Sequence, residues 1–429
     1  MSRKYIIIED LKLFNQRELR FRLLYSKSME KYFLTNTLYV KYDKEVGDVD
    51  ESILMVPCIA NVILIAWATG ADVYVEKLDK TYLESLSKIR SVLKKWYPKL
   101  PFSTKIDVEK VISNKFRGKN YGLLFSGGVD SACSYIRHRD KNPCLIMVRG
   151  ADMRLDDDIW FKIKKTYEDF AAEEGVEITF IECNTSELKN INLLQVEFGR
   201  FLTDFSWWGG IEHGIVFLGL CAPITVKKKI GTLFIASSFT KDFNYPWGSH
   251  PLIDNKVSWA DVRVIHDGYH LDRQEKIKVI KNYWLRKRKQ YPLRVCWENA
   301  AQFNCGKCEK CWRTMIGLII EGIDPKILGF HVEDNFLESV KSALQKRQLH
   351  LCNSVVYFWQ TLQNHINNNA LTHNLYNSKE FFEWFKTFKI RANVERGIIM
   401  PHLWIIYYRL PKSIQHLLSK FNKIRQLLR

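Results

Sequence analysis

The chain has 429 residues, a hydrophobic fraction of 46% and a formal net charge of +18 at pH 7. This length allows two or three domains with a large core, and the composition excludes a mainly disordered chain. The positive charge favours a polyanionic partner such as nucleic acid, an anionic membrane surface or a phosphate-rich substrate, although a generally basic proteome explains it equally well.

Ten cysteines and a start without a signal-peptide pattern indicate a reducing compartment, so we expect the protein to be cytoplasmic. Residues 52–71 are uncharged and long enough to cross a bilayer. Pro57, Asn61 and Thr69 interrupt this run and favour a buried helix of about twelve residues from Pro57. We therefore expect no transmembrane span. Six cysteines stand apart in apolar contexts and are predicted to be small core residues: Cys58, Cys133, Cys144, Cys183, Cys221 and Cys352.

Residues 1–119 form the first of three predicted regions. Short apolar runs broken by charges predict the strands of a small β-rich cap: 5–8, 21–25 and 37–42. After the buried helix, 72–76 is predicted to be a strand and 80–96 an amphipathic helix. The N-terminal region is therefore expected to be α/β or β-rich.

The sequence of 121–131 is YGLLFSGGVDS. Its first five residues predict a buried parallel strand, and 132–139 predict a helix. A glycine turn that leads into a helix directs backbone N–H groups and the helix dipole at one point, which favours a bound phosphate. The alternative is an ordinary strand-to-helix turn with a Ser or Asp cap.

This loop lacks the Gly-Lys-Ser/Thr of a Walker A motif. The spacing SGGxDS resembles the PP-loop of the ATP pyrophosphatase superfamily, whose members cleave ATP to AMP and pyrophosphate and adenylate an oxygen of the acceptor. The resemblance implies ATP and Mg²⁺ as cofactors, with Asp130 and Ser131 as catalytic residues and Asp130 positioning phosphate or Mg²⁺. The nucleotide-binding residues that it implies are Ser126, Gly127, Gly128, Val129, Asp130, Ser131 and Val148.

Strands and helices alternate from residue 121 onward. The expected strands are 144–148, 177–181 and 233–236, and the expected helical segments are 156–173, 191–228 and 272–289. This order predicts an α/β fold with a doubly wound parallel sheet. The PP-loop resemblance implies that this sheet is of the adenine nucleotide α-hydrolase-like kind. The stretch 242–275 is predicted to be a long irregular loop that either closes over the substrate or is a structural Ω-loop.

Ligands bind at the carboxyl ends of the strands in such sheets, where three loops are expected to meet: 126–131, 149–152 and 237–241. Position alone makes Asp152, Ser237 and Ser238 candidates. We expect Arg149 and Lys241 to supply the catalytic cations that neutralise phosphate charge. For each of these residues the alternative is an ordinary loop position.

Four cysteines lie within sixteen residues: Cys296, Cys305, Cys308 and Cys311. Tight CxxC turns donate N–H groups to thiolate sulfur, and four thiolates form a closed tetrahedral site. We therefore predict a structural Zn²⁺ that ties 290–325 to the core, with an iron–sulfur cluster as the alternative.

The two motifs together resemble those of the 7-cyano-7-deazaguanine synthases over about 120–325. The residues that carry this resemblance are Cys296, Trp297, Glu298, Asn299, Cys305, Gly306, Cys308, Cys311, Arg313 and Gly317. It implies zinc on the four cysteines, and adenylation of a carboxylate that ammonia converts to an amide and dehydration to a nitrile. The family's tyrosine-aspartate-cysteine-arginine segment has no counterpart and Arg313 is one position out of register, so the substrate does not carry over.

These motifs predict an ATP-dependent adenylating ligase. It would activate a carboxylate or carbonyl of a small molecule or nucleobase for attack by ammonia or an amine. One alternative is a tRNA-modifying thiolase or amidase, which the net charge favours. Another is a nucleotide-binding component of a defence complex that does not turn ATP over.

The third predicted region, 326–429, is helical and basic, with fifteen Lys and Arg against six Asp and Glu. Its last predicted helix, 413–429, carries an apolar face beside a row of cations. Such a helix binds nucleic acid, an acidic protein partner or an anionic membrane surface, or it docks on its own domain, which we expect here.

Overall fold

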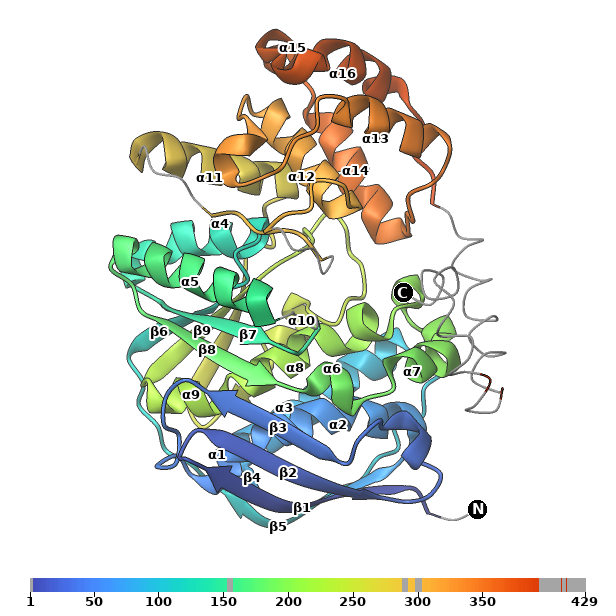
Figure 1. Ribbon diagram of the computed structural model, residues 1–429. Helices are drawn as coiled ribbons and strands as arrows, with labels where there is room; N and C mark the ends of the chain where they lie inside the picture. The colour runs from blue at the N-terminus through green and yellow to red at the C-terminus, as the bar shows by residue number, and fades with distance from the viewer. Residues whose placement is uncertain are drawn as a thin grey trace.

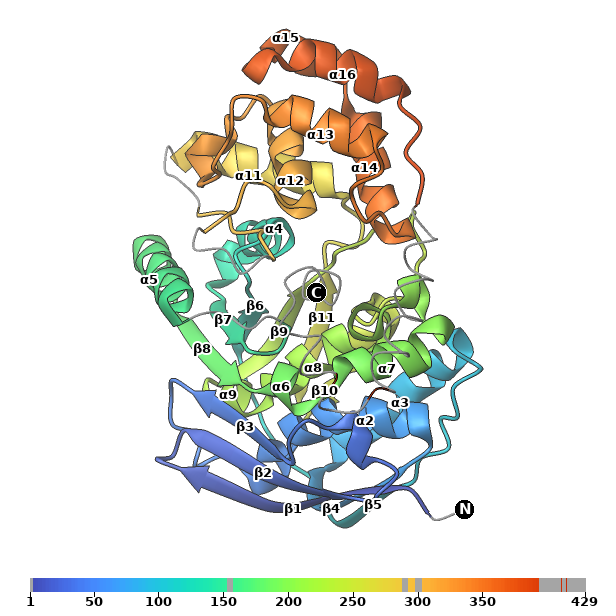
Figure 2. The ribbon, with the colours of Figure 1, turned by 45° about the vertical axis from the view of Figure 1, so that its right-hand side comes forward.

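The computed structural model of the protein describes residues 3–152, 157–287, 292–297 and 303–392, together with Leu410 and Ile414. One eleven-stranded sheet runs through the molecule in the order β10-β11-β9-β6-β7-β8-β3-β2-β1-β4-β5. A helical part that contains α11 to α16 lies above the sheet and its covering helices (Figures 1 and 2).

The N-terminal strands are part of the main sheet. They are β1 (Tyr5–Phe14), β2 (Glu18–Tyr25), β3 (Thr37–Tyr42), β4 (Asp72–Asp79) and β5 (Ile106–Ile112). The three strands predicted within the first 42 residues are confirmed, but they do not form a separate cap. Instead, β3 pairs antiparallel with β8 (Ile178–Cys183), so the sheet continues across the boundary predicted between 119 and 120.

Five neighbouring strands form the larger parallel part of the sheet: β8, β7 (Cys144–Arg149), β6 (Asn120–Leu124), β9 (Ile230–Ala236) and β11 (Val262–Asp267). The strands β1, β4 and β5 are also parallel to one another. The prediction of an irregular loop over 242–275 is wrong, because this stretch contains α10 (Pro251–Asp254), β10 (Ser258–Trp259) and β11. The strand β11 carries buried polar side chains at His266 and Asp267, which break the apolar pattern expected of a parallel strand.

Alternating residues of β7 belong to two different cores, so helices cover both faces of the sheet. Cys144 and Ile146 pack with α2 (Val56–Thr69), α8 (His213–Leu220) and α9 (Ala222–Lys227). Leu145 and Met147 pack on the other face, whose helices are α4 (Val129–His138), α5 (Asp157–Glu174), α11 (Arg273–Lys287) and α12 (Glu309–Ile320). The predicted α/β class with a large, mostly parallel sheet is confirmed.

The helix predicted from Pro57 is confirmed as α2, and every one of its residues is buried. The amphipathic helix α3 (Lys80–Trp96) has the predicted bounds. Shorter helices are α1 (Glu51–Leu54), α6 (Thr185–Leu188) and α7 (Ile191–Phe198). In the part of the chain that the structure describes, one helical run, Trp208–Lys227, is long and apolar enough to cross a membrane. However, 83% of its apolar window is buried inside the protein, as in a core helix.

The C-terminal region is helical as predicted as far as residue 387. Its helices are α13 (Phe336–Gln345), α14 (Asn353–His365), α15 (Asn368–His373) and α16 (Ser378–Thr387), which share a core with α11 and α12. The helix predicted over 413–429, with its proposed nucleic-acid, protein or membrane partners, lies outside the described residues except for Ile414.

Candidate functional site

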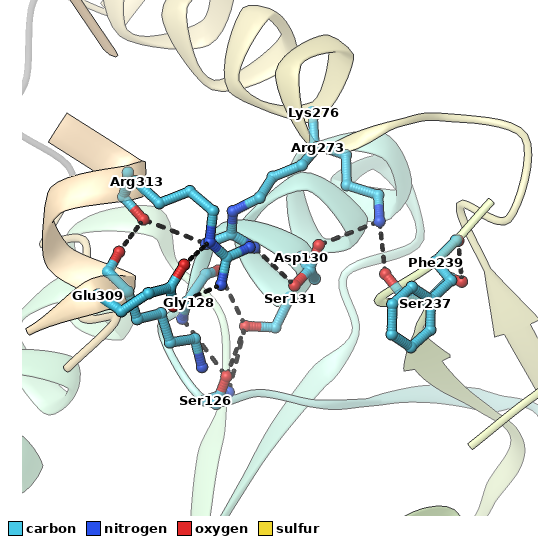
Figure 3. A network of polar contacts seen from close by, with 12 residues as sticks. Ser126, Gly128, Asp130, Ser131, Ser237, Phe239, Arg273, Lys276, Glu309 and Arg313 are labelled. Atoms are coloured by element: carbon cyan, nitrogen blue, oxygen red, sulfur yellow. Dashed lines mark hydrogen bonds and ion pairs between the residues drawn. The ribbon is translucent and has the colours of Figure 1, made fainter. Parts of the chain in front are cut away.

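The glycine loop connects β6 to α4 and is closed by two serines. The backbone N–H of Ser126 donates to Ser131 Oγ at 3.2 Å, and the N–H of Gly128 donates to Ser126 Oγ at 3.4 Å. Ser131 Oγ lies 3.2 Å from the Gly128 carbonyl, to which it donates. Both hydroxyls therefore hold the turn that precedes the N-terminus of α4, where the helix dipole favours an anion (Figure 3).

Only glycine fits at position 127. Its φ is +74°, and a Cβ built there would lie 1.6 Å from Tyr167 Oη. The Tyr167 hydroxyl donates to the Pro292 carbonyl at 2.8 Å, and the Arg294 N–H donates to the Gly127 carbonyl at 2.9 Å. The segment that leads to the cysteine cluster therefore lies directly against the glycine loop.

A Gly127→Ala substitution should destabilise the protein more than Gly175→Ala does. Both glycines have positive φ, but a Cβ at Gly175 would have no atom within 4 Å. The left-handed backbone costs either alanine about 1–2 kcal/mol. Overpacking against Tyr167 should cost Gly127→Ala about 1–3 kcal/mol more. Urea unfolding of both variants measures the difference, and equal losses would contradict the contact with Tyr167.

Two buried cations of α11 bind the loop carboxylate Asp130. Arg273 Nη1 lies 3.2 Å from one carboxylate oxygen, and Lys276 Nζ lies 3.0 Å from the other. Their side chains are only 4% and 2% exposed. Arg273 also donates to Thr314 Oγ1 at 3.2 Å, and Lys276 donates to the Ser237 carbonyl (Figure 3). Asp130 thus links the loop to α11, and Lys276 links α11 to the residue that follows β9.

Burial and charge act against each other on the pKa values of Asp130 and Arg273. Burial alone would raise the pKa of Asp130, but Lys276 and Arg273 outweigh it and hold this pKa below its usual value. Burial lowers the pKa of Arg273 to about 10, so its guanidinium remains protonated at neutral pH. Both partners are therefore charged under physiological conditions.

The first turn of α12 brings two more cations to the loop. Arg313 donates to the Glu309 carboxylate at 2.8 and 3.3 Å, and its guanidinium lies 4.3 Å from the centre of the Phe358 ring. Burial and the neighbouring Arg273 and Arg313 lower the pKa of Lys310. Four cations thus converge on the loop: Arg273, Lys276, Lys310 and Arg313.

Only two carboxylates, Asp130 and Glu309, pair with these cations in the described contacts. Two buried nitrogens in this group, Arg273 Nε and Arg313 Nη1, have no hydrogen-bond partner among the described residues. An excess of positive charge beside unpaired donors and a helix N-terminus is suited to a bound anion.

The loops predicted to meet do follow neighbouring strands, because β9, β6 and β7 are adjacent in the sheet. Ser237 joins the network through its carbonyl. Arg149 pairs with Glu182 of β8 at 3.2 Å, and Lys241 is exposed. Ser238 and Val148 are half-buried, and Asp152 is exposed. The catalytic roles of Arg149 and Lys241 stay predictions, since the described contacts place neither of them in the cation network.

Sequence analysis missed Arg273, Lys276 and Lys310 as site residues. A signal for the first two was present, because Arg273, Lys276, Ile277 and Ile280 recur at helical spacing and all are buried. Two cations on the buried face of a helix need buried counter-ions or a ligand. Lys310 carried no comparable signal, since it lies within a generally polar segment between two cysteines.

The four predicted metal ligands are clustered. One sulfur atom from each of Cys296, Cys305, Cys308 and Cys311 lies within 4.8 Å of the others, and such a group could hold a metal ion. The backbone N–H groups of Lys307 and Cys308 donate to Cys305 Sγ at 3.4 and 3.2 Å. These N–H groups stabilise a thiolate on Cys305, which is the form that binds a metal ion.

Asn304 holds the two arms of the cysteine cluster together. Its Oδ1 accepts from the N–H groups of Val295 and Cys296 at 2.9 and 3.3 Å, and its Nδ2 donates to the Leu293 carbonyl at 2.8 Å. Gly306 has φ +69°, and a Cβ there would lie 2.2 Å from the His331 carbonyl oxygen. These contacts fix the turn that leads into α12 and its cations.

Two structural units thus meet at the carboxyl edge of the parallel strands. One is the glycine loop with its four cations, and the other is the cysteine cluster from which α12 begins. The resemblance of 120–325 to the 7-cyano-7-deazaguanine synthases stays a prediction from the motifs. No family model matches the chain, and neither a curated protein nor a solved structure is significantly similar to it.

Proposed function

We propose that the protein is an ATP-dependent adenylating ligase of the PP-loop kind. It would cleave ATP to AMP and pyrophosphate and activate a carboxylate or carbonyl oxygen for attack by ammonia or an amine. The observation that carries this proposal is the convergence of four cations on a glycine loop, where two carboxylates leave an excess of positive charge.

The protein would position ATP and the acceptor and neutralise phosphate charge, without forming a covalent bond to the substrate. The N-terminus of α4 binds the leaving pyrophosphate, while the unpaired nitrogens of Arg273 and Arg313 neutralise its growing charge. Asp130 orients Arg273 and Lys276, because each of its oxygens already accepts from one of them. Because both Asp130 oxygens are already engaged, Mg²⁺ would bind to the ATP phosphates rather than to Asp130 and would neutralise part of their charge.

We assign zinc to the cysteine cluster and give it a structural role. Four thiolates suit Zn²⁺ and leave no coordination position for substrate. Zinc would fix the turn at Cys308, after which α12 begins, and so hold Lys310 and Arg313 at the loop. An iron–sulfur cluster on the same ligands would colour the protein brown.

The nucleotide products test this proposal. The protein should convert ATP to AMP and pyrophosphate when carboxylate-bearing small molecules or nucleobases are supplied with ammonium chloride. Ion-exchange chromatography separates these products from ADP and orthophosphate. ADP and orthophosphate as the sole products would contradict the PP-loop assignment. Binding of ATP without hydrolysis, whatever the acceptor, would favour a nucleotide-binding component without turnover.

A further inference from the structure

A buried histidine at the end of β11 has one ring nitrogen without a partner. His266 Nδ1 lies 2.7 Å from Asp254 Oδ2, and the Ser249 hydroxyl donates to the same oxygen at 2.6 Å. His266 is only 8% exposed, and its Nε2 has no hydrogen-bond partner among the described residues. A buried polar atom without a partner is uncommon and points to a ligand or to chemistry.

The contact with Asp254 places a proton on one nitrogen of this histidine. The carboxylate accepts a hydrogen bond from Nδ1, so in the neutral ring the lone pair lies on Nε2. The same arrangement in a Ser-His-Asp triad prepares the second nitrogen as a base. The neighbouring His250 is different, because its Nδ1 accepts from the Leu252 N–H and its Nε2 lies 3.1 Å from Tyr269 Oη.

His266 lies at the same edge of the sheet as the phosphate loop. It pairs with Ile235 of β9, and β9 is the neighbour of β6. The ends of β11 and β6 are two strand spacings apart, or about 10 Å. Ser237, which follows β9, accepts from Lys276 and so connects the two places. In the proposed function the pyrophosphate lies at the loop, so the α-phosphate and the acyl group of the adenylate would lie between the loop and His266.

His213 of α8 is a second histidine with a buried, unpartnered ring nitrogen, since its Nδ1 has no hydrogen-bond partner among the described residues. Burial lowers the pKa of His213, and the charges of Asp152 and Asp254 partly oppose this.

We propose that His266 Nε2 is the proton acceptor for the nitrogen nucleophile in the second half-reaction, with Asp254 and Ser249 as positioning residues. This inference rests on the proposed function. The nitrogen of ammonia or an amine forms a bond to the carbonyl carbon of the acyl adenylate. The bond from that carbon to the phosphate oxygen breaks, and AMP leaves with its electron pair. The nitrogen's proton passes to Nε2, and the Asp254 carboxylate stabilises the imidazolium until water removes the proton.

The test starts from a preformed acyl adenylate, benzoyl-AMP, so that it does not depend on ATP cleavage. Full-length, metal-loaded protein is mixed with benzoyl-AMP and ammonium chloride, and the initial rate of benzamide release is measured. His266→Gln should lower this rate by about 10²-fold or more, the usual contribution of a general base. His270→Gln is the matched control, since His270 is exposed four residues further along, and it should keep the wild-type rate.

A second nucleophile separates the chemical role from a structural one. Hydroxylamine is largely unprotonated at neutral pH and a much stronger nucleophile, so His266→Gln should release benzohydroxamate at close to the wild-type rate. Asp254→Asn should show the same loss of rate with ammonium chloride but not with hydroxylamine. It replaces His266→Gln in the test if His266→Gln does not fold. Equal rates of wild type and variants with ammonium chloride, or equal losses with both nucleophiles, would overturn the proposal. Failure of the proposed function would appear separately, as absence of AMP formation from ATP.

Discussion

The Cys308→Ser protein should purify with almost no bound metal, whereas the wild type should carry about one metal ion per chain. Its free energy of unfolding should fall by about 4 kcal/mol, which is the stabilisation that a ligand supplies at a thousand times its Kd. The reason is that three thiolates cannot close the tetrahedral site, and the binding energy of a structural metal is part of the folding energy. Elemental analysis and chemical unfolding measure the two effects.

Cys352→Ser is the matched control for this substitution. Cys352 is half-buried, and its sulfur lies 3.2 Å from Ser354 Oγ, away from the cysteine cluster. This variant should retain its metal and most of its stability. A Cys308→Ser protein with full metal content would show that the cluster is not the binding site.

Metal loss should also weaken the phosphate site. The helix α12 begins at Glu309, directly after Cys308, and carries Lys310 and Arg313. Without the metal the first turn of α12 is free to move, and two of the four cations leave their positions. Calorimetric titration of the Cys308→Ser protein with pyrophosphate should therefore show weaker binding than titration of Cys352→Ser.

A Lys276→Met substitution should reduce AMP formation from ATP by about 10²–10³-fold, the effect of removing one preorganised donor from an active site. The Lys276 side chain is 2% exposed and spans from Asp130 to the Ser237 carbonyl, so its loss removes a charge and a link between two loops. Methionine retains most of its volume in the core. The steady-state rate of pyrophosphate release measures the effect.

Lys278→Met provides the control, because Lys278 is exposed on the same helix. It should leave the rate of pyrophosphate release unchanged. If Lys276→Met folds normally, binds ATP and also retains full activity, the cation network cannot be the catalytic one. Arg149 and Lys241, which the sequence predicts as catalytic cations, would then be the remaining candidates.

Elements that bury apolar side chains in a simple pattern were predictable from the sequence. The helix α3 has the expected bounds, and β7 is a continuous apolar run because its two faces meet two cores. The strands β5 and β11 were missed. β5 lies at the edge of the sheet and carries exposed charges such as Glu109 and Lys110, while β11 buries His266 and Asp267.

The candidate site was predictable only where its residues are contiguous. The glycine loop and the four cysteines are local motifs, and a metal-binding cluster could be expected from spacing alone. Arg273 and Lys276 reach Asp130 from more than a hundred residues away. Arg149 and Lys241 are predicted as catalytic cations because they follow the ends of predicted strands in the sequence. This choice overlooks cations on helices that pack above the edge of the sheet, such as Arg273 and Lys276.

The pairing of β3 with β8 has a consequence for how the chain folds. Val40 pairs with Cys183, so the N-terminal strands cannot complete the sheet until the strand after α5 has been synthesised. Such non-local pairing slows folding and leaves two strand edges open meanwhile, each able to pair with another molecule. Removal of the N-terminal strands would likewise expose the edge of β8, which could then pair with another molecule.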